Sequence, residues 1–217
     1  MFNSIFCKQI IIHIFRNKKI LFFEKYKMLK QQKYNPSLDC SLFFERLSCK
    51  QLCHMFNNLA PNKIRERCNL IEKIIGKTGK VFIIEQPFMC DYGYNIEFGE
   101  NFGANHNLLI LDSAKVTFGN NVMVGPNCSF ITTKHPIESN ERKLGNQWAK
   151  PITIKDNVWI CANATVLAGV TIGENSVIGA GSIVTKDIPP NSFAVGIPCK
   201  VVKTISNLTS KQEKIKI

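Results

Sequence analysis

Apolar residues recur at every sixth position along the second half of the chain. The unbroken series is Ile154, Ile160, Val166, Ile172, Ile178 and Val184, and the residue two positions before each member is small or β-branched. Two earlier series have the same spacing and are offset by two residues: Phe98, Ala104 and Ile110, then Phe118, Val124 and Phe130. A period of six fits neither an α-helix nor a single alternating strand.

The six-residue period predicts a triangular solenoid. Each hexad makes one short strand and a corner, three hexads make a coil, and the apolar residue points into a continuous core. Glycine follows this residue in many hexads, as at Gly99, Gly119 and Gly173. We expect these glycines at tight corners that need a positive φ. An amyloid-like stack of strands is the alternative, but the regular glycines and asparagines argue against it.

Residues 38–76 show helical periodicity instead. Apolar residues from Leu42 to Leu59 follow an amphipathic pattern, which Ala60-Pro61-Asn62 interrupts. Asn62 is the expected N-cap of a second helical segment. We therefore expect a helical cap over residues 28–79, followed by the solenoid over residues 80–203.

One segment interrupts the hexads, at about residues 131–151. It is polar, lacks the six-residue pattern and carries His135, one of only four histidines in the chain. A loop extruded from a regular scaffold is a common location for binding and catalytic residues. His135 is therefore the first candidate for chemistry.

The net charge of +12 is concentrated at the two ends of the chain. Residues 1–33 hold eight Lys or Arg and one Glu, residues 200–217 hold five Lys and one Glu, and the stretch between is nearly neutral. This distribution argues against a nucleic-acid-binding face. We expect residues 1–27 to be an unstructured leader or upstream extension, with Met28 as the functional start, and residues 204–217 to be a basic tail.

The apolar runs in residues 1–27 are too short to cross a bilayer, and no small-residue cleavage site follows them. We therefore expect no stable membrane association, although a membrane-surface helix stays open as an alternative there.

The nine cysteines have irregular spacing and form no CxxC pair. Such a set is typical of reduced thiols in a cytoplasmic protein. Cys49 and Cys53 are four residues apart on one face of the expected helix. With no His/Cys cluster near them in the sequence, we interpret them as packed small hydrophobic residues.

Several longer motifs then occur in a fixed order. They are PFMCDYGYN (87–95), NFGANHNLLILD (101–112), TTKHP (132–136), PITIKDNVWI (151–160), GVTIGENSVIGAGSIVTKDIPPN (169–191) and GIPCKVV (196–202). On these motifs, residues 28–205 resemble the maltose, galactoside and nodulation-factor acetyltransferases, the sugar branch of the hexapeptide-repeat acyltransferases. The resemblance implies a left-handed parallel β-helix with an N-terminal helical cap, assembled as a homotrimer with each site between neighbouring subunits.

The resemblance also implies that acetyl-CoA donates an acetyl group to a sugar hydroxyl in a ternary complex. His135 is then the general base, a role that contributes about 10²–10⁴-fold to the rate. The cysteines are not nucleophiles, and no metal is required. The expected acceptor contacts are Asp91, Asn105, Asp112 and Ser113. The expected cofactor contacts are Ala162, Ala180, Thr185, Lys186, Lys200 and Lys203.

Three positions depart from the pattern of the resembling family. Ser113 occupies a position where a galactoside-type relative has an acidic substrate contact, which puts that contact in doubt. Cys161 and Lys155 replace glycines that are common at these positions, and Cys161 adds volume beside the expected cofactor channel.

Three other functions make different demands on the sequence. An acetyltransferase of another acceptor, such as an amino sugar, an antibiotic or serine, is the nearest alternative, and the sequence discriminates poorly against it. A zinc carbonic anhydrase of this fold needs three converging histidines. His13 and His54 precede the solenoid, so this function is rejected. A non-catalytic scaffold is disfavoured because the loop histidine and the small cofactor-wall residues are present.

Overall fold

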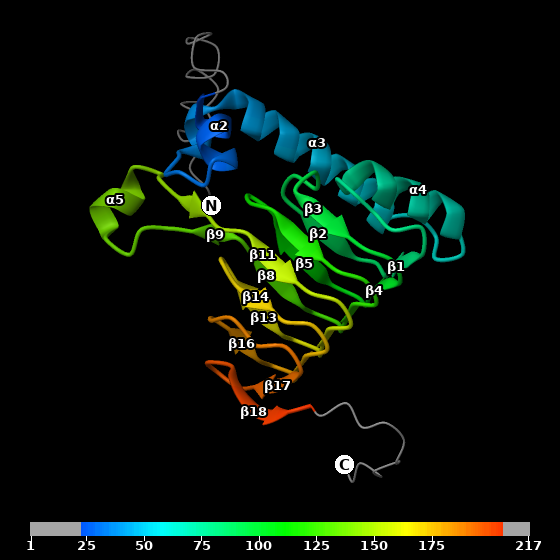
Figure 1. Cartoon of the computed structure of the whole chain (residues 1–217). Helices are drawn as coiled ribbons and strands as arrows, with labels where there is room; N and C mark the ends of the chain where they lie inside the picture. Colours follow the sequence, from blue (N-terminus) through cyan, green and yellow to red (C-terminus); the bar gives the residue numbers. More distant parts are fainter. Residues whose placement is uncertain (1–22, 206–217) are drawn as a thin grey trace, which may run out of the picture.

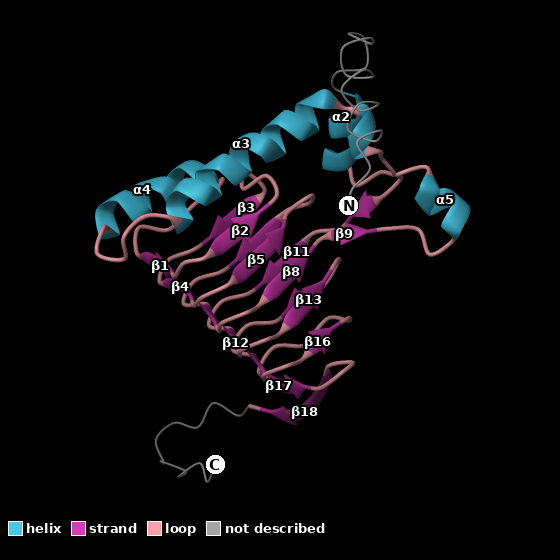
Figure 2. Cartoon of the chain, turned by 180° about the vertical axis from the view of Figure 1, so that it is seen from behind, coloured by secondary structure: helices cyan, strands magenta, loops and turns pink. Residues whose placement is uncertain are grey.

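The chain is described here by a computed structural model of residues 23–205. It is a triangular parallel β-helix whose first coil is covered by helices (Figures 1 and 2). The fold class predicted from the hexads is confirmed. Residues 1–22 of the expected leader and residues 206–217 of the expected tail lie outside the described residues.

The strands form three faces of the β-helix. The four-stranded face contains β3 (Ile96–Phe98), β6 (Val116–Phe118), β11 (Ile152–Ile154) and β14 (Thr171–Ile172). The five-stranded face contains β2 (Phe88–Cys90), β5 (Leu108–Leu111), β8 (Ser129–Ile131), β13 (Thr165–Leu167) and β16 (Ile183–Val184). The seven-stranded face contains β1 (Phe82–Ile84), β4 (Phe102–Ala104), β7 (Met123–Val124), β12 (Trp159–Ile160), β15 (Val177–Ile178), β17 (Ser192–Val195) and β18 (Lys200–Thr204). Neighbouring strands are parallel except for β17 and β18.

The predicted inward positions stack in register. Phe98 pairs with Phe118, and Ile154 pairs with Ile172, so the earlier coil is two residues longer, as the offset between the hexad series requires. All of these residues are buried. Phenylalanine rings of successive strands contact one another inside the prism, at centroid distances of 4.5 to 5.0 Å for Phe98–Phe102, Phe102–Phe118 and Phe118–Phe130.

The expected reason for the corner glycines was wrong. Positive φ falls mainly on asparagines: Asn101, Asn107, Asn121, Asn127, Asn157, Asn163, Asn175 and Asn191. Gly99 and Gly119 are needed instead because the next coil approaches closely. A Cβ atom at Gly119 would lie 2.1 Å from Asp156 Oδ1, and one at Gly99 would lie 2.4 Å from Asn120 Oδ1.

The left-handed asparagines at one corner also bond to one another. Side-chain amides link Asn101 to Asn121, Asn121 to Asn157, Asn157 to Asn175 and Asn175 to Asn191, at 2.9 to 3.0 Å. This asparagine ladder runs along the corner between the four-stranded and seven-stranded faces.

The helical layer contains α2 (Phe23–Leu29), the 3₁₀ turn η1 (Pro36–Leu38), α3 (Cys40–Asn57) and α4 (Ile64–Ile74). α3 begins after Asp39, whose side chain accepts from the Ser41 amide. The expected N-cap at Asn62 was wrong, because α4 begins after Lys63, which makes no side-chain cap. α2 spans the expected boundary between residues 27 and 28, and Glu24 within it is buried.

The helices close the open end of the hydrophobic core. Phe56, Ile71 and Ile74 belong to the same buried cluster as the inward residues of the β-helix. In the part of the chain that the structure describes, no helix combines the length and apolar character that a membrane span requires.

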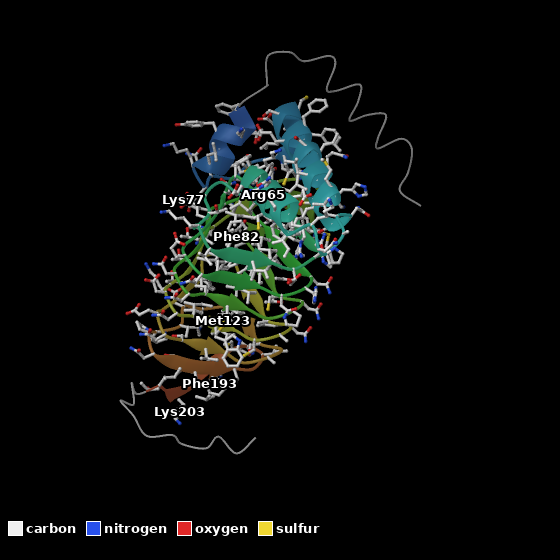
Figure 3. The ribbon with its side chains drawn as sticks, turned by 90° about the vertical axis from the view of Figure 1, so that its right-hand side faces the viewer. Arg65, Lys77, Phe82, Met123, Phe193 and Lys203 are labelled. Atoms are coloured by element: carbon white, nitrogen blue, oxygen red, sulfur yellow. The ribbon has the colours of Figure 1, made fainter. Side chains whose placement is uncertain are left out.

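The outward rows of two faces differ in chemistry. On the seven-stranded face the row in register is Ile83, Gly103, Met123, Trp159, Val177 and Phe193. On the four-stranded face it is Glu97, Thr117, Thr153 and Thr171. Figure 3 views the seven-stranded face, with Met123 and Phe193 labelled on separate coils.

Candidate active site

Several of the predicted acceptor residues meet at one edge of the five-stranded face. β2, β5 and β8 are parallel neighbours, with Cys90, Ile110 and Phe130 in register. Asp91 and Asp112 therefore follow the carboxyl ends of adjacent strands, and the loop that carries His135 leaves from the end of the third.

Asp112 supports this edge from inside. Its Oδ1 accepts from the backbone amides of Asp91 at 3.0 Å and Tyr92 at 2.8 Å, and the residue is 0% exposed. Burial raises the pKa of the carboxyl to about 6; the hydrogen bond from the Tyr92 amide opposes this change, and the charge of Asp91 adds to it. Oδ2 has no hydrogen-bond partner in residues 23–205. In a single chain Asp112 thus orients the turn that carries Asp91.

Ser113 is also buried, at the base of the His135 loop. Its oxygen accepts from the Thr133 hydroxyl at 3.1 Å. Thr132 braces the same point, because its hydroxyl donates to the Leu111 carbonyl at 2.6 Å and accepts from the Ala114 amide at 3.1 Å. Both threonines come from TTKHP, so that motif fastens the loop as well as supplying the histidine.

The loop is a hairpin that projects from the prism (Figure 1). β9 (Thr133–Lys134) and β10 (Trp148–Ala149) form its stem, and α5 (Ser139–Lys143) lies at its tip. His135 directly follows β9, with an exposed side chain.

The helical layer holds the far side of this hairpin. Tyr34 and Gln147 exchange two backbone hydrogen bonds at 3.0 and 2.9 Å. The Asn35 side-chain amide donates to the Leu144 carbonyl at 2.6 Å, and the Asn35 backbone amide donates to buried Glu24 at 2.7 Å. The position of His135 thus depends on the residues that precede α3.

Asp91 is the predicted residue that faces an open cavity at this edge. The cavity, of about 410 Å³, is lined by Asp91, Lys50, His54, Asn57, Met89 and Leu109, among others. Burial raises the pKa of the Asp91 carboxyl, while the positive charges of Arg46 and Lys50 oppose this change. The two bases are one helical turn apart on α3, and the sequence analysis did not identify them. The four-residue spacing of Arg46 and Lys50, which places both on one face of the expected helix, was the signal in the sequence that could have identified them.

Three other predicted residues lie at the opposite edge of the five-stranded face. Ala104, Val124, Ile160 and Ile178 are in register, so Asn105, Ala162 and Ala180 lie along the same corner on three different coils. Asn105 and Ala180 are exposed, and Ala162 is half-buried. The Asn105 side chain accepts from the amide of His106 at 2.7 Å.

Cys161 lies on the same corner, half-buried beside Ala162. Its carbonyl accepts from the Cys128 thiol at 3.1 Å. Gly181, next to Ala180, has a φ of 70° and no atom within 4 Å of the position of an added Cβ. The corner is therefore open around Ala180.

The predicted lysines are distributed over two regions. Thr185 and Lys186 follow β16, at the same edge as Asp91, whereas Lys200 and Lys203 lie on β18 at the end of the prism. All four are exposed.

A single chain does not bring His135 and the Asn105–Ala162–Ala180 corner together. Each strand of the five-stranded face runs from the one edge to the other, and β5 (Leu108–Leu111) separates Asn105 from Asp112. At about 3.3 Å per residue, the four residues of β5 alone span on the order of 13 Å.

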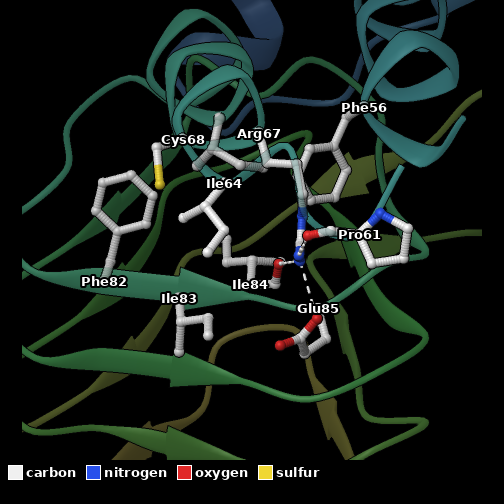
Figure 4. Close-up of a pocket in the computed structure, with 10 residues that line it drawn as sticks. Phe56, Pro61, Ile64, Arg67, Cys68, Phe82, Ile83, Ile84 and Glu85 are labelled. Atoms are coloured by element: carbon white, nitrogen blue, oxygen red, sulfur yellow. Dashed lines mark hydrogen bonds and ion pairs between the residues drawn. The ribbon is translucent and has the colours of Figure 1, made fainter. Parts of the chain in front are cut away.

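A second cavity, of about 380 Å³, lies between α4 and β1 (Figure 4). It is largely apolar, and Arg67 crosses it to donate to Glu85 at 2.8 Å and to the Ile84 carbonyl at 2.9 Å. None of the predicted site residues lines it.

Known families match both parts of the chain. The bacterial transferase hexapeptide (six repeats) matches residues 151–186, and the maltose acetyltransferase hexapeptide capping motif matches residues 27–79. Together with the triangular β-helix, these matches define the chain as a hexapeptide-repeat transferase.

Individual relatives narrow this class. The galactoside O-acetyltransferase of Escherichia coli K12 is 46% identical over 163 residues, which cover 75% of this chain and 80% of the relative. The crystal structure of a maltose O-acetyltransferase from Clostridium difficile 630 has a TM-score of 0.83 and 46% identity, covering 85% of this chain and 98% of that chain. A galactoside acetyltransferase in complex with coenzyme A has a TM-score of 0.83 and 39% identity, covering 89% of this chain and 98% of that chain. The chain belongs to the maltose and galactoside O-acetyltransferase family and is an acyltransferase.

Proposed function

We propose that the protein transfers an acetyl group from acetyl-CoA to a hydroxyl of a sugar such as maltose, glucose or a galactoside. The observation that carries this proposal is the exposed His135 on a hairpin that the cap and TTKHP hold firmly, within a chain of this family. The reduced cysteines fit a cytoplasmic enzyme, since no disulfide joins cysteines within residues 23–205.

His135 acts as the general base in this proposal. Its neutral imidazole takes the proton of the acceptor hydroxyl as the oxygen attacks the acetyl carbonyl. Asp91, with Arg46 and Lys50 beside it, orients the acceptor through its hydroxyl groups. Asp112 and Ser113 support that contact by fixing the Asp91 turn and the base of the hairpin.

The donor fits the corner at Ala162 and Ala180. Acetyl-CoA supplies the thioester that is attacked: a C–O bond to the acceptor forms, the C–S bond breaks, and CoA leaves as the thiol with the proton that His135 took. Small side chains and the open space at Gly181 leave room for an extended pantetheine arm. A backbone amide near Ala162 donates to the developing oxyanion, a contact whose loss costs about 2.7–4 kcal/mol in related cases. Thr185, Lys186, Lys200 and Lys203 are assigned to the nucleotide end.

The site is completed by a second copy of the chain. His135 and the Ala162–Ala180 corner lie at opposite edges of one face. The edge that carries His135 in one subunit must therefore lie against the Ala162–Ala180 edge of its neighbour. Three subunits arranged head to tail in this way close a ring. The apolar outward row of the seven-stranded face supplies a contact surface, since Met123 and Trp159 are 57% and 47% exposed in the isolated chain. We therefore infer a homotrimer.

Replacement of His135 by alanine tests the assigned base. We expect kcat/KM with acetyl-CoA and a sugar panel to fall by about 10²–10⁴-fold, because base catalysis is lost. Lys143→Ala, on α5 of the same hairpin, is the matched control and retains the wild-type rate. Thiol release measures the reaction. An unchanged rate in His135→Ala contradicts the role.

Acetyltransfer to another acceptor, such as an amino sugar, an antibiotic or serine, is the alternative that the same assay separates. Amines and alcohols are compared at equal concentration with the wild-type enzyme. Activity on amines alone contradicts the sugar-hydroxyl proposal.

A further inference from the structure

Three cysteines with no part in the proposed acetyl transfer meet beneath α3. Cys49 and Cys53 lie one turn apart on α3, and Cys90 ends β2. Cys90 Sγ lies 3.4 Å from Cys49 Sγ and 3.8 Å from Cys53 Sγ, and all three sulfur atoms lie within 4.8 Å of one another. Each residue is only 4% exposed. Cys49 and Cys53 belong to the buried hydrophobic core, as their interpretation as packed small hydrophobic residues predicted, and tertiary packing adds Cys90 as a third thiol beside them.

The sulfur triangle has the dimensions of a metal site. Thiolate ligands bind zinc at about 2.3 Å, which places two sulfurs of a tetrahedral ion about 3.8 Å apart. The observed separations bracket that value, so one ion can contact all three sulfurs with small side-chain adjustments. A disulfide requires about 2.05 Å between two sulfurs, and the third thiol would then have no role.

The backbone around the cluster is held in place. The Asn57 side chain, one turn beyond Cys53, donates to the Phe88 carbonyl at 2.9 Å and accepts from the Phe88 amide at 2.8 Å. This double hydrogen bond fixes α3 against β2. Ligands on two regular elements that are clamped together are preorganised for binding.

An ion has access to the cluster and a counter-charge beside it. Cys53 and Cys90 line the cavity of about 410 Å³ that also contains Lys50. Cys49 lines a separate cavity of about 340 Å³ on the other side of α3. A water molecule reaching the ion through either opening completes a fourth ligand position. The Lys50 ammonium in this cavity opposes the excess negative charge of three thiolates around a divalent ion, whereas the Asp91 carboxylate in the same cavity adds to it.

The thiolate is the form that binds metal. Binding of an ion to the three sulfurs therefore releases their thiol protons to solvent.

We propose that Cys49, Cys53 and Cys90 form a binding site for a single thiophilic d¹⁰ cation of the Zn²⁺ or Cu⁺ class. Soft thiolates select such ions over Mg²⁺ or Ca²⁺. The ion takes no part in acetyl transfer and is structural: it ties α3 to the first coil, next to the cavity that Asp91 also lines.

Metal titration of the full chain tests this proposal. The reduced, metal-free protein is titrated with Zn²⁺, and separately with Cu⁺, against a chromophoric chelator. We expect one equivalent per chain for at least one of the two ions, and none for Mg²⁺. Cys53→Ala and Cys90→Ala each weaken binding by about 100-fold or more, since even the loss of an outer-shell contact costs 10–100-fold. Cys68→Ala, a half-buried cysteine on α4, leaves the affinity unchanged.

A measurement on the wild-type protein avoids any folding defect of the variants. The bound ion protects Cys49, Cys53 and Cys90 from an alkylating reagent, while Cys68 reacts equally with and without it, as peptide mass spectrometry reports. Absence of binding by both ions overturns the proposal. So does binding that leaves the three thiols as reactive as in the metal-free protein, or a Cys49–Cys90 disulfide in the native chain.

Discussion

The seven-stranded and four-stranded faces follow the same six-residue period and bury the same kind of inward residue, yet their outer rows differ completely. The four-stranded face presents Thr117, Thr153 and Thr171 beside Glu97, a row that water solvates well. The seven-stranded face presents Met123 and Trp159 in an apolar row. The inward residues determine the fold, and the outward residues determine whether each face contacts water or another protein surface. This difference is the basis for placing a neighbouring subunit against the seven-stranded face.

A charge on the apolar row is expected to have the largest effect. Met123→Glu places an unpaired carboxylate in each subunit contact, at a cost of roughly 3–5 kcal/mol per contact. We expect the trimer to dissociate. The rate of acetyl transfer should then fall by at least the factor expected for His135→Ala. Analytical ultracentrifugation measures the assembly.

Thr153→Glu, on the polar row, is the control for this experiment. It introduces the same charge at an equivalent strand position, and the trimer is expected to persist. If the two variants assemble equally well, the seven-stranded face is not the contact surface.

A smaller effect is expected at the edge between the five-stranded and four-stranded faces, where Asp112 is buried. The pKa of Asp112 is raised from 3.8 in the unfolded chain to about 6 in the folded protein. The contribution of this group to the stability of the folded protein is therefore fully present below pH 3.8 and is lost as the pH rises through 6. From pH 5 to pH 7 this single group lowers the free energy of unfolding by about 1 kcal/mol.

Asp112→Asn isolates this contribution, because its side-chain oxygen still accepts from the two backbone amides. Urea unfolding at pH 5 and pH 7, at one protein concentration, gives the free-energy difference between wild type and variant. We expect this difference to shift by about 1 kcal/mol in favour of the variant at pH 7. A difference that does not change with pH indicates that Asp112 stays ionised in the folded protein.

A further effect on stability is expected at the corner that joins the two compared faces. Asn157 has a φ of 57° and two side-chain bonds within the asparagine ladder. Asn157→Ala is expected to lower the free energy of unfolding by about 1–2 kcal/mol from backbone strain, with a further loss from the two bonds.

Asn163→Ala separates these two contributions. Asn163 has a similar φ of 60°, and its side chain has no hydrogen-bond partner among residues 23–205. Thermal unfolding of both variants gives the difference that belongs to the ladder. Equal losses show that the ladder bonds contribute nothing measurable.

The inward rows could be predicted from the sequence because the six-residue period is itself the structural repeat. Even the extra two residues near Asp112 appeared as an offset between Ile110 and Phe118. The corners were harder to predict. Gly119 is fixed by the approach of Asp156 from the next coil, which is a contact between residues far apart in sequence and not a local φ requirement.

The same limit applies to the candidate site. The spacing in TTKHP identified His135, but it carried no information on Tyr34 and Gln147, which hold the hairpin through the cap. For the same reason the sequence did not link Cys90 to Cys49 and Cys53, because only the packing of α3 on β2 brings them together. The position of Asn105 at the far edge from His135 follows from the coil register and not from either motif.

The central claim is that each active site joins one edge of a chain to the opposite edge of its neighbour, and mixed trimers test it most directly. One partner carries His135→Ala, and the other carries Ala180→Trp, which fills the open corner. Each variant alone is expected to be inactive. When equal amounts are unfolded and reassembled together, random assembly gives intact sites at about one quarter of the wild-type number. Recovery of about a quarter of wild-type activity supports the shared site, and mixed trimers as inactive as the parent variants contradict it.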